Sequence, residues 1–332
     1  MIGTQIAAAF ENRTALVTGG TGLIGREVVR RLCDFGARVR SVSLDELPTD
    51  SRAEQVSGDL RSFDFCREIT LNMDFVFHVA GIKGSVDVTK AQPASTFVPL
   101  MLMNTSVLEA ARENGAAKVV YTSTIGVYGA ADEFREEDDD FLTPPMDVYP
   151  GWAKRMAEMQ IAAYREQFGH DHFAIVRPCN VYGPGDNFDP ATAMVIPSLM
   201  ARIAAGERPL SVWGDGSAIR DFAFSTDVAE GIILALHHGT RGSFVNLGGG
   251  GACSIAELVE TLSKIAGVDY VFDTTKPAGY PVRIMDISRA RDWLGYNPET
   301  NLEAGMQATW DWFQKNADAY LARKDFFAEA TP

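Results

Sequence analysis

The sequence predicts an α/β protein, in which a doubly wound parallel sheet is followed by a smaller C-terminal α/β lobe. Three observations predict this fold class. Short apolar runs alternate with amphipathic stretches through the first half of the chain. A glycine-rich turn joins the first apolar run to the first amphipathic stretch. After Pro178, glycine and proline become frequent and the expected elements become shorter.

Five apolar runs predict the strands of the parallel sheet. Each run is continuous rather than alternating, which suits a strand that is buried on both faces. The runs occupy residues 15–18, 39–42, 75–79, 119–122 and 173–176. Between them, apolar residues recur at the spacing of an amphipathic helix, first at Leu23, Ile24, Val28, Val29 and Leu32, and later at Leu102, Val107, Leu108 and Ala111.

The strongest local signal is the segment Thr18-Gly-Gly-Thr-Gly-Leu-Ile-Gly25, between the first predicted strand and the first predicted helix. Glycine lets a pyrophosphate approach the backbone, and the N-terminus of a helix favours an anion. The segment therefore predicts a Rossmann-type dinucleotide site, and the residues expected to contact the cofactor here are Gly19, Gly22, Leu23, Ile24 and Gly25.

The residues after the second predicted strand bear on the choice of cofactor. An acidic residue at the end of this strand binds the ribose 2′-hydroxyl of NAD, whereas a nearby arginine pairs with the extra phosphate of NADP. The expected position falls on Ser43, and Asp45 follows two residues later. Asp45 favours NAD, and NADP stays open because Arg38 and Arg40 lie nearby.

Charge and composition exclude several classes of partner. Thirty basic and 44 acidic residues among 332 give a net charge of −14, which argues against nucleic acid and against an anionic membrane surface. No apolar run approaches the roughly 18 residues of a membrane span, and the N-terminus lacks the features of a signal peptide. The four cysteines are widely spaced and form no metal-binding pattern. We expect a cytoplasmic protein without a metal site, and a solvated loop over the acidic residues 136–140.

Several further motifs carry a resemblance to a known family. They are Gly58-Asp-Leu60, His78-Val-Ala-Gly81, the segment 122–129 with Thr124, Arg177-Pro-Cys-Asn-Val-Tyr-Gly-Pro-Gly185, Trp213-Gly-Asp-Gly-Ser-Ala-Ile-Arg-Asp-Phe222 and the segment 276–283. From Thr14 to about Phe313 the chain resembles the extended short-chain dehydrogenases/reductases, in the NAD-dependent epimerase/dehydratase family of nucleotide-sugar enzymes. Within that family it is most similar to the GDP-fucose synthases and UDP-galactose 4-epimerases.

The resemblance implies a role for each motif. It implies further cofactor contacts at Asp59, Leu60, Val79, Ala80, Gly81, Thr122 and Lys154. It implies contacts with a nucleotide-diphosphate sugar at Lys83, Ser85, Thr124, Asn180, Trp213, Arg220 and Arg283. Two arginines suit a diphosphate because a guanidinium binds phosphate oxygens in bidentate fashion. We expect a cofactor domain over residues 1–179, to which a segment near 220–250 returns, and a nucleotide-sugar lobe over residues 180–332.

The family transfers hydrogen at a sugar carbon, usually C4, with a Tyr, a Lys four residues later and a Ser or Thr. Here these roles fall on Tyr149, Lys154 and Thr124, but the Tyr and Lys are five residues apart. On one regular helix this offset separates two side chains by about 140°. Pro150 could begin the helix and leave Tyr149 outside it, able to reach Lys154. Alternatively, the proton shuttle is lost and the protein binds its ligand with altered or no turnover.

Three other positions narrow the reaction that the resemblance implies. Ile125 and Gly126 stand where dehydratases carry two acids, so dehydration is disfavoured. Gly126 and Met194 stand where GDP-fucose synthases carry a Cys and a His, so 3,5-epimerisation is disfavoured as well. The expected function is C4 epimerisation or 4-keto-sugar reduction with NAD or NADP in a homodimer, and a reductase of a non-sugar carbonyl stays open as an alternative.

Overall fold

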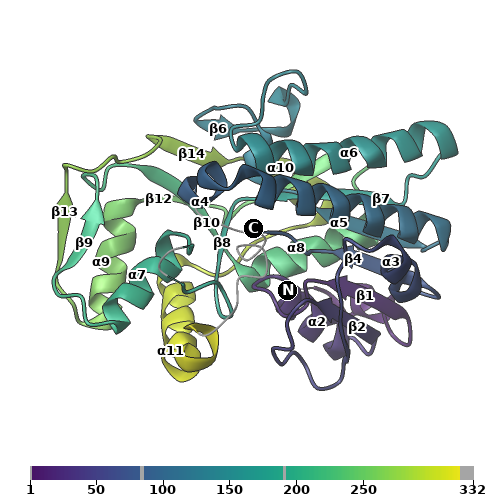
Figure 1. Ribbon diagram of the computed structural model, residues 1–332, viewed down its shortest axis with the longest axis horizontal. Coiled ribbons are helices and arrows are strands. Elements are labelled where there is room, and N and C mark those ends of the chain that lie inside the picture. The colour runs from purple at the N-terminus through teal and green to yellow at the C-terminus, as the bar shows by residue number, and fades with distance from the viewer. Residues whose placement is uncertain (1, 83–85, 190–191, 322–332) are drawn as a thin grey trace.

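The protein, described here by a computed structural model, has a seven-stranded parallel sheet as its largest unit (Figure 1). The structure describes residues 2–82, 86–189 and 192–321. The order of strands across the sheet is β11-β7-β5-β4-β1-β2-β3. Their bounds are β1 Thr14–Thr18, β2 Arg38–Ser43, β3 Glu54–Ser57, β4 Phe75–His78, β5 Lys118–Thr122, β7 Phe173–Pro178 and β11 Phe244–Leu247.

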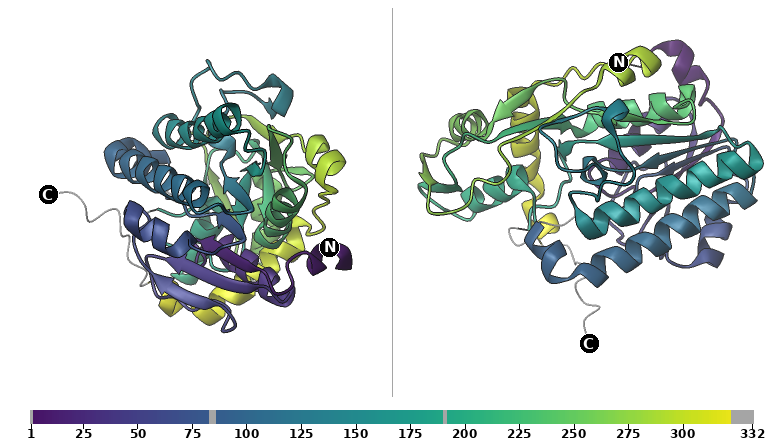
Figure 2. Two further views of the ribbon diagram at one scale, coloured as in Figure 1. Left: turned by 90° about the vertical axis from the view of Figure 1, so that its right-hand side faces the viewer. Right: turned by 90° about the horizontal axis from the view of Figure 1, so that it is seen from above.

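Helices cover both faces of this sheet (Figure 2). On one face lie α3 (Phe63–Thr70), α5 (Pro93–Glu113) and α6 (Val148–Phe168), and on the other lie α2 (Gly25–Asp34), α8 (Ser225–His238) and α10 (Ser288–Leu294). Successive residues of β1 alternate between the two cores, since Ala15 and Val17 face α2 and α8 whereas Leu16 faces α3 and α5. Burial on both faces explains the continuous apolar runs of the sequence and confirms the predicted fold class.

All five predicted strands are present, as β1, β2, β4, β5 and β7. Strands β3 and β11 were not predicted. Val56 is the single large apolar residue of β3, which forms the edge of the sheet and is mostly exposed. Strand β11 follows α8 and pairs with β7, so the chain returns to the large sheet after leaving it. The proposed division into two domains near residue 179 stays a prediction.

The C-terminal lobe is built from shorter elements around a separate core (Figure 1). One small sheet has the order β12-β10-β14-β6, with β8 also paired to β10, and β13 pairs with β9. The core holds Phe188 stacked on Phe313 at 4.2 Å between ring centroids. The strands are β6 Glu133–Phe134, β8 Asn180–Tyr182, β9 Leu210–Trp213, β10 Ile219–Phe224, β12 Ala252–Ser254, β13 Tyr270–Asp273 and β14 Val282–Met285.

The remaining elements are helices and short 3₁₀ turns. They are α1 Thr4–Ala8, α4 Val86–Ala91, α7 Val195–Ala204, α9 Ile255–Ala266, α11 Leu302–Leu321, η1 Ile125–Val127 and η2 Glu136–Asp138. No helix within residues 2–82, 86–189 and 192–321 is long and apolar enough to cross a bilayer.

The prediction of a solvated loop over residues 136–140 is right for Glu137, Asp138 and Asp140, which are exposed, and wrong for Glu136 and Asp139. Residues 136–138 form η2, and Glu136 is buried and accepts a hydrogen bond from the backbone N–H of Asn246. Asp139 pairs with the buried Arg177 at 3.0 Å. The run therefore supplies two carboxylates to the interior, because charged groups of the opposite sign are buried beside them.

Candidate active site

The glycine-rich loop is held against the ends of β2 and β4. The backbone N–H of Gly19 donates to the carbonyl of Val42 at 2.7 Å, and Gly19 has a positive φ of 71°. A Cβ on Gly19 would lie 2.8 Å from the Cα of Ala80, and one on Gly25 would lie 2.1 Å from the carbonyl oxygen of Gly19. These glycines are therefore required by the turn itself.

The loop ends at the N-terminus of α2, where a phosphate would bind. The helix begins at Gly25, after Leu23 and Ile24. The backbone N–H groups of Leu23 and Ile24 have no hydrogen-bond partner among the described residues. Free amides at a helix N-terminus fit a diphosphate, so the loop suits the cofactor that the sequence predicts.

A buried polar network connects this loop to the middle of the sheet. Thr18 Oγ1 accepts hydrogen bonds from the N–H groups of Val79 and Ala80 and lies 2.8 Å from His78 Nδ1. His78 Nε2 lies 3.0 Å from Asn104 Oδ1, and Asn104 Nδ2 donates to Tyr121 Oη at 3.1 Å. The sequence does not reveal this network, because the residues that form it are far apart in the chain: Thr18, His78, Asn104 and Tyr121.

Burial keeps His78 uncharged. Burial, and to a smaller extent the ammonium of Lys154, lower the pKa of His78 from 6.5 to about 3. Neutral His78 therefore accepts at Nδ1 from Thr18 and donates at Nε2 to Asn104, which fixes the orientation of both partners.

Lys154 lies beside the carboxyl ends of β4 and β5. Its Nζ donates to the carbonyl oxygen of Thr122 at 2.7 Å and lies 3.4 Å from the position of a Cβ on Gly81. Burial lowers the pKa of Lys154 from 10.5 to about 8, against the opposing effect of Glu158. The hydroxyl of Thr122 is buried without a hydrogen-bond partner in the described part of the chain. The Lys154 ammonium and the Thr122 hydroxyl are therefore available to bind a ligand at this end of the sheet.

Thr124 precedes η1 as its N-cap residue. Its Oγ1 accepts a hydrogen bond from the N–H of Gly126 at 3.2 Å, and the residue is half-buried. Thr124 and Lys154 are thus both held near the end of β5. Thr124 follows the strand by two residues, and Lys154 donates to the carbonyl of Thr122, the last residue of the strand.

Tyr149 does not join them. The expectation that Pro150 is the first residue of the helix is wrong, because α6 begins at Val148 and Tyr149 lies in its first turn. Tyr149 is 47% exposed, and its ring packs edge-on against Phe97 of α5 with 6.3 Å between centroids. Since Lys154 is buried and five residues away on the same helix, the two side chains point to different sides of α6.

The two predicted phosphate-binding arginines lie side by side in the C-terminal lobe. Arg220 of β10 is in register with Arg283 of β14. No ion pair joins either guanidinium to a carboxylate among the described residues, and Nε of Arg283 is buried without a hydrogen-bond partner there. Burial, and then the charge of Arg283, lower the pKa of Arg220. Two adjacent, unpaired cations form a site for a doubly charged anion.

Two other predicted substrate contacts, Trp213 and Asn180, belong to the same lobe as these arginines. The loop after β13 crosses Arg220, whose Nη2 lies 3.3 Å from a Cβ position on Gly279. Trp213 ends β9, is 54% exposed and stacks with the Lys276 ammonium 5.7 Å from its ring centroid. Asn180 Nδ2 donates to the carbonyl of Asp221 next to Arg220. Lys83 and Ser85 lie outside the described residues.

The predicted cofactor contacts on β2 and β3 have partners of their own. Asp45 follows β2, and its Oδ1 accepts from the N–H of Leu47 at 3.3 Å. Arg40 is engaged by Glu54 at 2.9 Å, away from Asp45. Asp59 pairs with Arg61 at 2.6 Å, and the hydrogen bond from Arg61 lowers the pKa of Asp59. Leu60 is buried in the core between the sheet and α3.

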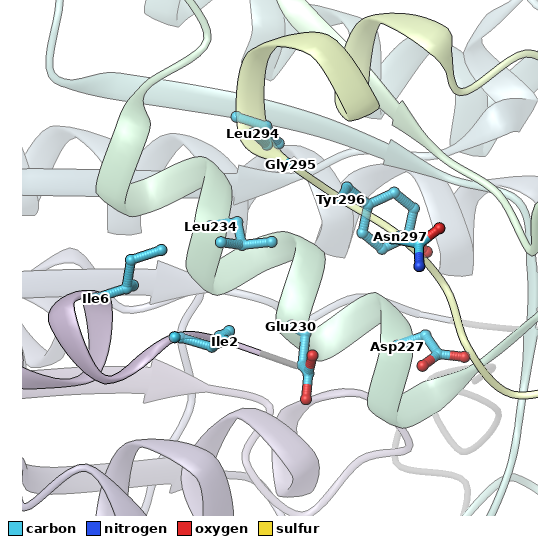
Figure 3. Close-up of a pocket in the computed structure, with 10 residues that line it drawn as sticks. Ile2, Ile6, Asp227, Glu230, Leu234, Leu294, Gly295, Tyr296 and Asn297 are labelled. Carbon is cyan, nitrogen blue, oxygen red and sulfur yellow. The ribbon is translucent and has the colours of Figure 1, made fainter.

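A separate cavity of about 210 Å³ lies between α1, α8 and the segment after α10 (Figure 3). Asp227 and Glu230 project into it from one side of α8, and Tyr296 and Asn297 line the opposite wall (Figure 3). Its lining has two carboxylates and no basic residue, so it does not suit a diphosphate. No cluster of His, Cys, Asp and Glu with the makings of a metal site occurs in the ranges that the structure describes.

Comparisons with known proteins agree with this arrangement. Residues 15–248 match the model of the NAD dependent epimerase/dehydratase family. A dTDP-4-dehydro-6-deoxy-D-allose reductase of Streptomyces sp is 31% identical over 93% of this chain and 98% of its own length. A GDP-L-fucose synthase of Sinorhizobium fredii is 29% identical over 92% of this chain and 97% of its own.

A solved structure has a similar fold. The UDP-glucose 4-epimerase of Thermotoga maritima superposes with a TM-score of 0.77 at 27% identity, over 92% of this chain and 99% of that one. The family match covers the glycine-rich loop, the polar network, Thr124, Lys154 and Arg220. This chain belongs to the NAD-dependent epimerase/dehydratase family.

Proposed function

We propose that this protein is an NAD(P)-dependent nucleotide-sugar enzyme that acts at C4 of the sugar, as a C4 epimerase or a 4-keto-sugar reductase. The observation that carries the proposal is the pair Arg220 and Arg283, in register on adjacent strands and without carboxylate partners among the described residues. Both arginines are half-buried, and two like charges held side by side there favour binding of an anion. A nucleoside diphosphate supplies that charge.

The cofactor would bind along the carboxyl ends of β1, β2 and β4. Gly19, Gly22 and Gly25 would shape the turn, and the amides of Leu23 and Ile24 would hold the pyrophosphate. Asp45 favours NAD, because a carboxylate beside the ribose binds a 2′-hydroxyl and repels a 2′-phosphate. A bound nicotinamide cofactor would supply or accept a hydride, that is a proton with two electrons, at the sugar carbon.

Lys154 and Thr124 would act where the sugar meets the nicotinamide. Lys154 Nζ would hold the nicotinamide ribose, and its positive charge would stabilise a negative oxygen nearby. Thr124 Oγ1 would donate a hydrogen bond to the reacting sugar oxygen. Binding of the remote diphosphate by the two arginines would hold the sugar in position for these groups.

The test of the proposal is a binding panel of UDP-, dTDP- and GDP-hexoses, measured by calorimetry with the wild type, Arg220→Ala, Arg283→Ala and Arg135→Ala. We expect 10- to 100-fold weaker binding of the nucleotide sugar for the first two variants, because each loses a charge-assisted hydrogen bond. NAD binding should stay unchanged. Arg135→Ala is the matched control, because Arg135 is an exposed arginine paired with Glu133. Failure of every nucleoside diphosphate to bind contradicts the proposal.

The dinucleotide released on denaturation separates the two reactions. Tightly retained NAD supports an epimerase, which must keep its cofactor through oxidation and reduction of the same sugar. A site that fills preferentially with NADPH supports a 4-keto-sugar reductase. Absorbance and mass spectrometry of the released dinucleotide distinguish these outcomes.

The proposed assembly is a homodimer in the cytoplasm. The two long helices α5 and α6 pack against each other, and their outer sides expose the apolar residues Val98, Leu102, Met156 and Met159. Apolar residues grouped on two neighbouring helices favour an interface between copies. Sedimentation of the wild type and of the variant Leu102→Glu/Met159→Glu tests this, and a wild type that sediments as a monomer contradicts it.

A further inference from the structure

Directly before α6 lies a carboxyl group that the predicted machinery does not use. Asp147 precedes α6 at the N-cap position, where aspartate usually accepts a hydrogen bond from the helix backbone. Here the side chain makes no capping bond. Asp147 is half-buried, and no hydrogen bond or ion pair engages its carboxylate among the described residues. The group therefore serves neither of the structural purposes that are usual for a carboxylate at this position.

Two glycines bring this carboxyl group against η1. A Cβ on Gly126 would lie 2.3 Å from Oδ2 of Asp147, so a larger residue would displace the carboxyl group. A Cβ on Gly151 would lie 2.7 Å from the carbonyl oxygen of Gly126 and 2.5 Å from Cβ of Pro145. The close approach of α6 to η1 thus depends on both glycines, and it places the Asp147 carboxylate directly above Gly126.

The same approach puts Asp147 beside the other groups of the site. The N–H of Gly126 donates to Thr124 Oγ1, so the Thr124 hydroxyl and the Asp147 carboxylate both lie against Gly126. Lys154 is buried on α6, whereas Tyr149 is exposed and packs against Phe97, so these two side chains lie on different sides of the helix. Asp147 precedes the helix with φ −95° and ψ 77°, and its contact with Gly126 defines its position.

Among the described residues, Arg283 of β14 is the charged group that acts on Asp147, and it attracts the carboxylate. The residues of η1, Ile125–Val127, carry no titratable side chain. Burial raises the pKa of Asp147 above its usual value of 3.8, with Arg283 opposing this rise. A carboxyl group with a raised pKa can hold a proton closer to neutral pH than an exposed one.

We infer that Asp147 transfers the proton at the reacting oxygen of the sugar, in the place that the sequence assigns to Tyr149. The inference rests on the proposed function. In the reductive direction, the O–H bond of the protonated carboxyl group breaks and a new O–H bond forms on the C4 carbonyl oxygen, whose carbon is reduced by the dihydronicotinamide cofactor. The carboxylate left behind is protonated again from solvent. In the oxidative direction, the carboxylate accepts the proton of the C4 hydroxyl.

The experiment compares Asp147→Asn with Tyr149→Phe in the full-length protein. The substrate is the member of the UDP-, dTDP- and GDP-hexose panel that binds the wild type most tightly, or its 4-keto form. We expect Asp147→Asn to lower kcat at least 100-fold, the smallest contribution typical of a general acid or base. We expect Tyr149→Phe to keep kcat within threefold of the wild type. Retained turnover in Asp147→Asn, or loss in Tyr149→Phe alone, overturns the inference.

A second readout does not depend on turnover. Affinity for the nucleotide sugar is measured by calorimetry between pH 5 and 8 and compared with affinity for the matching nucleoside diphosphate. The difference between the two should change with pH in the wild type, because only the sugar reaches Asp147, and it should be flat in Asp147→Asn. The same pH dependence in both proteins overturns the inference. The inference also fails if Asp147→Asn alters the affinity for the nucleoside diphosphate and leaves kcat unchanged, because the carboxylate then only offsets the charge of Arg283.

The outcomes separate this inference from the proposed function. If no nucleoside diphosphate binds the wild type, the proposed function fails, and the inference fails with it. If the nucleotide sugar binds and is turned over equally by the wild type and Asp147→Asn, the proposed function stands and only the inference fails.

Discussion

Helix α6 carries two sets of buried charges that differ in how they are compensated. In its middle, Glu158 forms a bidentate ion pair with Arg177 at 2.6 and 3.0 Å, and Asp139 pairs with Arg177 and with Arg155. At its N-terminal end, Asp147 has neither an ion pair nor a hydrogen bond among the described residues.

Lys154 and Arg283 complete the second set. Lys154 Nζ is bound only to a carbonyl oxygen, and Nε of Arg283 has no partner in the described part of the chain. The difference separates charges that stabilise the fold from charges that a ligand would compensate. Paired charges hold α6 against β7 and the segment before η2, whereas uncompensated charges mark the place where a ligand completes the site.

The largest expected effect is in the paired set. Arg177→Leu leaves the carboxylate of Glu158 without its cation and leaves Asp139 with Arg155 alone, at 3.6 Å. We expect the free energy of unfolding to fall by about 3–5 kcal/mol, as for other broken buried ion pairs. Urea denaturation measures it. The control Lys264→Ala removes an exposed pair with Glu260 and should cost less than about 1 kcal/mol. A loss below 1 kcal/mol for Arg177→Leu would remove the contrast between the two sets.

The next effect concerns Lys154 in the uncompensated set. Its pKa is about 8 in the folded protein and 10.5 when unfolded, so the unfolded state binds more protons between these values. The contribution of Lys154 to stability therefore rises as pH increases from about 8 to 10.5, by about 3 kcal/mol in total. Denaturation of wild type and Lys154→Met across this range should differ by this slope. Parallel curves would show that Lys154 keeps its ordinary pKa.

A smaller effect of opposite sign is expected for Asp147. Its pKa is raised in the folded state, so the folded protein binds more protons than the unfolded protein above pH 3.8. The ionised carboxylate thus destabilises the fold as pH rises above this value. At pH 7, Asp147→Asn should be as stable as the wild type or more stable, measured by thermal unfolding. A clear loss of stability would mean that the carboxylate has a structural role.

The smallest effect is expected for Tyr149→Phe. The side chain is 47% exposed and its hydroxyl has no hydrogen-bond partner among the described residues. We expect a change in the free energy of unfolding within about 0.5 kcal/mol. Urea denaturation checks this. A larger loss would indicate that the tyrosine hydroxyl is bound and would bring Tyr149 back into consideration as part of the site.

The sequence was sufficient to predict a feature wherever the residues that form it are consecutive in the chain. The glycine loop was predictable, because the strand, the turn and the helix that form it are consecutive and glycine is demanded by contacts such as that of Gly25 with Gly19. The five central strands were predictable from their continuous apolar runs. Strand β3 was not, because a mostly exposed edge strand carries little of that apolar signal.

The sequence by itself determined the fold class, the dinucleotide loop and the candidate residues Thr124, Lys154, Arg220 and Arg283. The tertiary structure alone decided that Arg220 and Arg283 are neighbours and that the acidic run 136–140 supplies interior carboxylates. It also decided that Asp147 lies against Gly126 whereas Tyr149 packs on Phe97. The reason is physical: spacing along the chain specifies an angle on a helix. Which side of the helix meets the rest of the protein depends on packing contacts, such as those of Gly126 and Gly151, between elements distant in the sequence.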